Sequence, residues 1–220
     1  MGKGHSARGR YPRPMGRLTE VGRSAARGVF EPPARVLTRW GVSPDAVTVL
    51  GTVGVAAGAL GFYPRGELLV GTLVIVVFVF SDSLDGTMAR LSGRSGPWGA
   101  FLDSTLDRVG DAAIFSGLAW WFLGDGDEPL LGALALLGLV GGLMVSYARA
   151  RGEGLGLDAT GGVAERSERL VAVLLGTGLA GLGVPFVQAV ALWFVAVGAW
   201  VTVGQRILGA RRSSSRATPA

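Results

Sequence analysis

Long apolar runs, separated by short polar breaks, occupy most of this 220-residue chain. The clearest run is the stretch 68–80, which contains thirteen consecutive residues without a charge. Hydrophobic residues make up 49% of the chain and charged residues only 17%. A helix needs about 20 mainly apolar residues to cross the hydrocarbon core of a bilayer. The pattern therefore predicts an all-α membrane protein rather than a soluble domain.

The apolar runs and the short connections between them predict a polytopic protein with six transmembrane helices. The expected spans are about 43–62, 67–91, 97–123, 129–151, 164–182 and 185–208.

A juxtamembrane amphipathic helix over 25–40 is expected before the first span, with Val36, Leu37 and Trp40 on one side. Ser43 is expected to cap the first span and Pro44 to occupy its first turn. We expect one membrane domain over 25–209, which includes the surface helix. The basic tails flank it over 1–24, expected to be disordered, and over 210–220.

Positive charge gathers at the two ends of the chain. Residues 1–39 contain nine basic and two acidic residues, and residues 206–220 contain four basic and no acidic residues. The segment 40–205 contains eight basic and fourteen acidic residues. The positive-inside rule then places both termini on the cytoplasmic side of a cell membrane. In an apolar chain, basic ends favour anionic membrane lipid as a partner over nucleic acid, which we do not expect to bind.

The composition excludes several kinds of chemistry. The chain has no cysteine, and its one histidine, His5, lies in the basic N-terminal tail. Thiol catalysis, disulfides, cysteine-ligated metals and Ser-His-Asp triads are therefore not expected. Carboxylates, arginines, hydroxyl groups and backbone must carry any reaction.

Five aspartates fall inside the second and third spans, and four of them form two closely spaced pairs. Asp82 and Asp85 are three residues apart, and Asp103 and Asp107 are four apart, so each pair shares a helix face. Asp85 and Asp103 are each nine residues from residue 94, roughly 13 Å along their helices. Four carboxylates at similar depth need a compensating charge, and oxygen ligands favour Mg²⁺ or Mn²⁺. Asp111 continues the face of Asp107 and either pairs with Arg108 or lies near the metal; we favour the structural role.

These aspartates belong to the pattern D-x-x-D-G-x-x-A-R, eight further residues, and G-x-x-x-D-x-x-x-D. The fixed positions are Asp82, Asp85, Gly86, Ala89, Arg90, Gly99, Asp103 and Asp107. This pattern resembles the signature of the CDP-alcohol phosphatidyltransferases, a family of metal-dependent membrane enzymes of phospholipid biosynthesis. Eight defined positions within 26 residues make the resemblance highly specific.

The resemblance implies a reaction and roles for these residues. The hydroxyl group of an acceptor alcohol attacks the β-phosphorus of a CDP-linked lipid, here CDP-diacylglycerol, and CMP leaves. Two divalent ions, Mg²⁺ or Mn²⁺, are expected on Asp82, Asp85, Asp103 and Asp107, with Asp107 also as the general base. The residues expected to border CDP-diacylglycerol are Asp45, Gly86, Ala89, Arg90 and Gly99.

Arginines at the predicted cytoplasmic ends of the last three spans favour a phosphorylated acceptor. The runs 146–151 (SYARAR) and 164–169 (AERSER) are similar to those of bacterial phosphatidylinositol phosphate synthases, which use myo-inositol 1-phosphate. That resemblance implies a bacterial inner-membrane enzyme, a homodimer, with its active site on the cytoplasmic side. It places the acceptor phosphate on Ser146, Arg149, Arg151, Arg169 and Arg206; many relatives have lysine where this chain has Arg149.

Two alternatives stay open at this point. A phosphatidylglycerophosphate synthase would use glycerol 3-phosphate in the same kind of arginine pocket. A divalent cation transporter would use the acidic hairpin as an ion path, but carboxylates near one side with arginines beside them favour an anionic substrate.

Overall fold

The computed structural model describes residues 31–93 and 96–217, apart from the side chains of residues 81–83, 216 and 217. Every regular element in these ranges is a helix, which confirms the all-α class. The elements after residue 43 are α2 (Pro44–Phe62), the 3₁₀ helix η1 (Tyr63–Arg65), α3 (Leu68–Leu91), α4 (Pro97–Leu123), α5 (Pro129–Gly154), α6 (Arg166–Gly181) and α7 (Val187–Ala217).

Residues 31–39 are helical, within the range 25–40 where a surface helix is predicted; residues 25–30 and the tail 1–24 lie outside the described ranges. Ala34 is fully buried and packs with Val47 of α2 and Met88 of α3. Leu37 packs against the same cluster, whereas Trp40 is 77% exposed. The short helix is therefore anchored over the start of α2 and the end of α3.

The expected start of α2 is confirmed. The side chain of Ser43 accepts a hydrogen bond from the backbone N–H of Ala46 at 3.2 Å, and Pro44 is the first helical residue. α4 and α5 also begin with proline, at Pro97 and Pro129. Proline is well suited to these positions because the first N–H groups of a helix have no partner within the helix.

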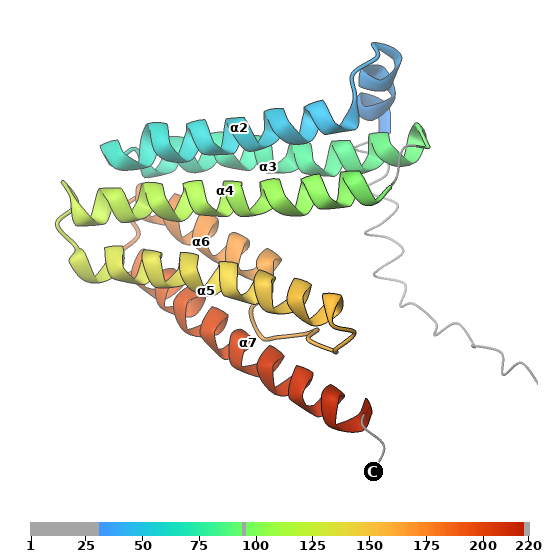
Figure 1. Cartoon of the computed structure of the whole chain (residues 1–220). Coiled ribbons are helices and arrows are strands. Elements are labelled where there is room, and N and C mark those ends of the chain that lie inside the picture. The colour runs from blue at the N-terminus through green and yellow to red at the C-terminus, as the bar shows by residue number, and fades with distance from the viewer. Residues whose placement is uncertain (1–30, 94–95, 218–220) are drawn as a thin grey trace, which may run out of the picture.

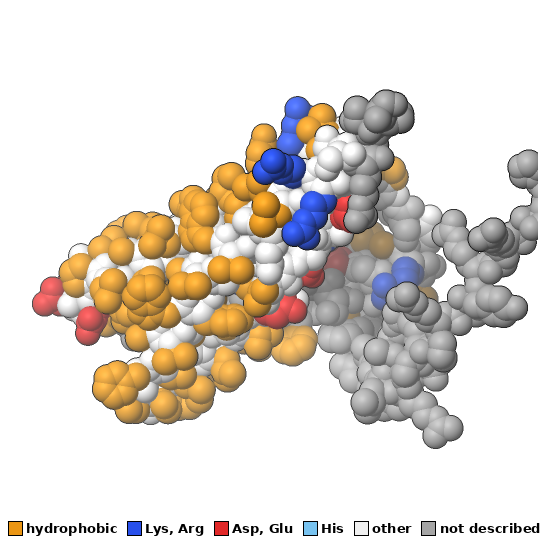
Figure 2. All heavy atoms as spheres, turned by 90° about the horizontal axis from the view of Figure 1, so that it is seen from below, with side chains coloured by type: hydrophobic (Ala, Val, Ile, Leu, Met, Phe, Trp, Pro, Cys, Tyr) orange, Lys and Arg blue, Asp and Glu red, His pale blue; other side chains and the backbone are white. Residues whose placement is uncertain are grey.

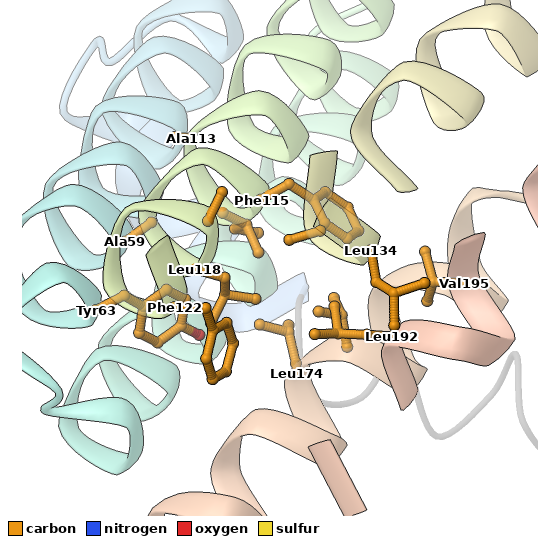
Figure 3. Packing of buried hydrophobic residues seen from close by; sticks show 14 of the residues in the cluster. Ala59, Tyr63, Ala113, Phe115, Leu118, Phe122, Leu134, Leu174, Leu192 and Val195 are labelled. Atoms are coloured by element: carbon orange, nitrogen blue, oxygen red, sulfur yellow. The ribbon is translucent and has the colours of Figure 1, made fainter. Parts of the chain in front are cut away.

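The contacts between the six long helices connect them in a closed ring. α2 packs against α3 and α4, α4 continues to α5, α5 to α7, α7 to α6, and α6 returns to α3. The main core lies where these helices meet and includes Tyr63, Phe115, Leu118, Phe122 and Leu192 (Figure 3). Short turns make the helices alternate in direction, so the starts of α2, α4 and α6 share one end of the ring with the ends of α3, α5 and α7 (Figure 1).

The prediction of six spans is confirmed in part. Four of the described segments are long and apolar enough to cross a membrane: Pro44–Arg65, Leu68–Leu91, Pro129–Gly154 and Val187–Ser215. α4 has 27 residues but contains three aspartates and an arginine, and α6 has only 16 residues. α7 also continues past the expected end at 208 to Ala217, so most of the predicted C-terminal tail is helical. Hydrophobic side chains cover much of the surface along the helices (Figure 2).

The close contact between α2 and α4 depends on Gly117. A Cβ atom at this position would lie 2.6 Å from the carbonyl oxygen of Ala59, which is backbone and cannot move alone. We expect Gly117→Ala to destabilise the protein by about 1–3 kcal/mol, the usual range for overpacking. Thermal unfolding in detergent measures the loss. Gly61→Ala is the control because a Cβ there meets no atom within 4 Å, and an equal loss in both variants would contradict this explanation.

Candidate active site

Two polar cavities lie at the end of the ring where α2 and α4 start. The first, which we call the carboxylate cleft, has a volume of about 370 Å³ and lies between α2, α3 and α4. It brings together Asp85 and Asp103 with all five residues expected to border the CDP-linked lipid. Its complete lining is Pro44, Asp45, Thr48, Asp85, Gly86, Ala89, Arg90, Gly96, Gly99, Ala100 and Asp103.

Glycine keeps the wall of the carboxylate cleft open. A Cβ atom at Gly86 or Gly99 would meet no atom within 4 Å, and neither residue has a positive φ. Packing and backbone conformation therefore do not require glycine at these positions. The space that a side chain would fill remains available to a ligand, as the sequence motif predicted.

Asp85 is held from a neighbouring helix. Its side chain is buried, with the residue 7% exposed, and Thr48 Oγ1 lies 2.5 Å from Asp85 Oδ2. The same hydroxyl lies 3.1 Å from the carbonyl oxygen of Pro44, but the charged acceptor at the shorter distance gives the stronger bond. The sequence analysis missed Thr48, which lies one turn after the helix cap and carried no motif of its own.

Asp103 and Asp107 follow one another on the same face of α4, but only Asp103 lines the carboxylate cleft. Asp107 lines a smaller cavity of about 30 Å³ beside it, together with Asp111 and Arg166. Asp107 Oδ1 lies 2.9 Å from Arg166 Nη1, and Asp107 Oδ2 lies 3.2 Å from Arg108 Nη1. Asp107 therefore lies one helical turn from the cleft and between two arginines.

Of the four expected metal ligands, the structure describes the side chains of Asp85, Asp103 and Asp107. Among the side chains that the structure does describe, no three carboxylates are placed to share one metal ion. Asp82 lies on α3, one turn before Asp85. The oxygen donors of Asp85 and Asp103 and the open space beside the glycines fit a hard divalent cation.

A hydrogen bond joins α2 and α4 beside the carboxylate cleft. The indole N–H of Trp98 donates to Asp45 Oδ2 at 3.0 Å. Asp45, expected at the nucleotide side, therefore lines the cleft with one carboxylate oxygen held by Trp98. The sequence analysis did not assign Trp98 to the site.

The second cavity, which we call the arginine pocket, has a volume of about 440 Å³ and lies between α4, α5, α6 and α7. Four of the five residues expected to bind the acceptor phosphate line it: Ser146, Arg149, Arg169 and Arg206. Arg151 is exposed and does not line it. Arg108 and Arg166 also line the pocket, and neither was among the expected site residues.

Two arginines of this pocket are deeply buried and hold the connection between α5 and α6. Arg206, which is 3% exposed, donates from Nη1 to the carbonyl oxygen of Val145 at 2.7 Å and from Nε to that of Gly161 at 3.0 Å. Arg169, also 3% exposed, donates from Nη1 to the carbonyl oxygen of Ala164 at 2.7 Å. These bonds fix the pocket wall, a role that the sequence analysis did not foresee for either residue.

The remaining side chains of the pocket are ordered by polar contacts. Arg108 Nε donates to Ser146 Oγ at 2.9 Å, and Arg149 Nε donates to Glu153 Oε1 at 2.9 Å. Arg108 thus contacts Asp107 with one nitrogen and Ser146 with another. The arginine pocket and the carboxylate of Asp107 are in direct contact.

The sequence model of the CDP-alcohol phosphatidyltransferase family matches residues 41–204, which include the whole lining of the carboxylate cleft and that of the arginine pocket except Arg206. The chain belongs to this family. Six of the eight fixed positions of the family motif line the carboxylate cleft: Asp85, Gly86, Ala89, Arg90, Gly99 and Asp103.

Several characterised members of the family are similar over almost the whole chain. The phosphatidylinositol phosphate synthase of Streptomyces avermitilis is 52% identical over 100% of this chain and 94% of its own length. That of Mycolicibacterium smegmatis is 42% identical over 90% of each chain. Crystal structures of the Mycobacterium tuberculosis phosphatidylinositol phosphate synthase align with a TM-score of 0.83 and 39% identity, covering 87% of this chain. The alignment covers 93% of the chain in the structure with manganese and citrate, and 98% of the chain in the structure with CDP-diacylglycerol bound.

Proposed function

We propose that this protein transfers the phosphatidyl group of CDP-diacylglycerol to myo-inositol 1-phosphate, giving phosphatidylinositol phosphate and CMP. The observation that carries the proposal is the position of Asp107, which lies one helical turn from Asp103 of the carboxylate cleft and contacts Arg108 and Arg166 of the arginine pocket. The carboxylate cleft suits a nucleotide diphosphate with its metal, and the arginine pocket suits a phosphate monoester. The names of the similar enzymes support the same acceptor.

The donor would lie in the carboxylate cleft, with its diphosphate near Asp85, Asp103 and Arg90. Its acyl chains would stay in the bilayer.

In the proposed reaction the acceptor hydroxyl oxygen forms a bond to the β-phosphorus while the bond from that phosphorus to the CMP oxygen breaks. Asp107 would accept the hydroxyl proton, since it lies between the two cavities. Asp82, Asp85, Asp103 and Asp107 would hold two Mg²⁺ or Mn²⁺ ions. Bound metal would neutralise the diphosphate and stabilise the leaving phosphate.

For the membrane arrangement we propose that all six long helices cross the bilayer, with both termini and the site on the cytoplasmic side. The ring supports this, because α4 lies between α2 and α5, and α6 between α3 and α7. The exposed Arg211 and Arg212 at the end of α7 would face anionic lipid. A homodimer is proposed from the family resemblance alone.

The proposed function is tested by CMP release from CDP-diacylglycerol in detergent with Mg²⁺. We would compare myo-inositol 1-phosphate, free inositol and glycerol 3-phosphate as acceptors. Release with inositol phosphate alone is expected. Release with glycerol 3-phosphate instead would overturn the acceptor and support a phosphatidylglycerophosphate synthase. Divalent cation flux in vesicles without CMP release would support the transporter.

The bond from Thr48 to Asp85 should matter for metal affinity. We expect Thr48→Val to weaken Mn²⁺ binding by about 10-fold, the lower end for a partner that orients a ligand. Free Mn²⁺ measured by electron paramagnetic resonance gives the affinity directly. Thr48→Ser keeps the hydroxyl and is the control. Unchanged affinity in Thr48→Val would show that the hydroxyl does not orient Asp85.

A further inference from the structure

Asp111 lies one turn beyond Asp107 on α4, away from the carboxylate cleft. Its side chain is 16% exposed and faces the cavity of about 30 Å³ that Asp107 and Arg166 also line. The motif of the family ends at Asp107, and the sequence predicts only a structural role for Asp111. Its partner is Arg166, at the start of α6, rather than the neighbouring Arg108 that the sequence suggested as one possibility.

Arg166 joins the two carboxylates. Its Nε lies 3.2 Å from Asp111 Oδ1 and 3.3 Å from Asp111 Oδ2, so both carboxylate oxygens accept a hydrogen bond from the same N–H group. Its Nη1 lies 2.9 Å from Asp107 Oδ1. The guanidinium is planar and rigid, so fixing Nε also fixes the direction of the terminal nitrogens. Asp111 therefore determines where Arg166 meets Asp107.

The same guanidinium also lines the arginine pocket. Without Asp111, Arg166 would pair with Asp107 alone, in a partly buried site where a lone arginine competes with any other cation for that carboxylate. With Asp111 present, Arg166 keeps an anionic partner when Asp107 engages another group. Asp107 can therefore act as a metal ligand or a general base without leaving Arg166 unpaired.

We propose that Asp111 is a positioning residue that holds Arg166 between the arginine pocket and the cavity of about 30 Å³ that Asp107 lines. Asp107 then stays available to bind metal and accept a proton, and Arg166 stays directed to the acceptor phosphate. The inference rests on the proposed function for the acceptor. Its effect on the metal can be measured without any acceptor.

The test compares Asp111→Asn, Asp111→Glu and Arg166→Gln with the full-length wild-type protein. We expect Asp111→Asn to weaken Mn²⁺ binding, measured by electron paramagnetic resonance, and to raise the KM for inositol phosphate, each by about 10-fold. The KM for CDP-diacylglycerol should stay within twofold. Asp111→Glu, which keeps the charge, should recover most of both losses.

A double variant separates positioning from general support of the fold. If Asp111 acts through Arg166, then Asp111→Asn should change neither the Mn²⁺ affinity nor the KM for inositol phosphate when it is introduced into the Arg166→Gln variant. Additive losses, or a parallel fall in melting temperature and in affinity for both substrates, would overturn the proposal. Failure of the wild-type protein to use inositol phosphate would instead refute the proposed function, and the Mn²⁺ result would still decide the role of Asp111.

Discussion

Replacing Asp107 by Asn is expected to reduce CMP release by about 10²- to 10⁴-fold, the usual contribution of a general base. Asparagine has almost the same shape but cannot accept the proton of the acceptor hydroxyl. Arg166 would keep its contacts with Asp111, so the helices around the site should stay in place. The rate at saturating concentrations of both substrates measures the effect.

Asp125→Asn is the matched control, because Asp125 lies just beyond α4 at the opposite end of the ring from the site. It should leave the rate unchanged. Mn²⁺ titration of Asp107→Asn then shows whether the variant still binds the metal, and so whether a lower rate reflects loss of the general base or loss of metal binding. A variant that keeps more than a tenth of the wild-type rate would show that the proton leaves by another route.

The carboxylate cleft was predictable because its residues are set by local helical geometry. Spacings of three and four residues place side chains on one face, and a short turn brings two such faces together. That reasoning grouped Asp85 and Asp103 with Asp82 and Asp107, and the structure places Asp85 and Asp103 around one cleft, with Asp107 one turn away. The start of α2 was predictable for the same reason, since Ser43 and Pro44 act within one turn.

Contacts between distant segments were not predictable in this way. Arg166 meets Asp111 across 55 positions, and Arg206 bonds to the carbonyl oxygen of Val145 across 61. No spacing rule relates such pairs, and a backbone carbonyl leaves no trace in the sequence. The family resemblance assigned the arginines to the acceptor phosphate, and it carried no sign that Arg169 and Arg206 hold the pocket wall.

The prediction of six membrane spans is confirmed only in part, for a different reason. Four helices are apolar enough to be recognised alone. α4 carries the charges of the site and α6 has only 16 residues, so neither is recognised as a span from its own length and hydropathy. The charged residues of the site thus lower the mean hydropathy of α4, the helix that carries Asp103 and Asp107.

Arg149 and Arg151 offer a direct test of the arginine pocket. α5 continues to Gly154, so both residues are helical and, being two apart, point in different directions. Arg149 lines the pocket and Arg151 does not. A hydrogen bond to a charged group contributes about 1.5–3 kcal/mol, so Arg149→Gln should raise the KM for inositol phosphate by about 10- to 100-fold. The KM for CDP-diacylglycerol should hardly change.

Arg151→Gln is the control for the same change of charge at nearly the same depth. It should alter the KM for inositol phosphate less than twofold, because an exposed arginine outside the pocket contributes only weak, screened attraction. Equal effects of the two substitutions would mean that the acceptor responds to the overall positive field and not to the pocket. A larger effect at Arg151 would move the acceptor phosphate to the other side of α5.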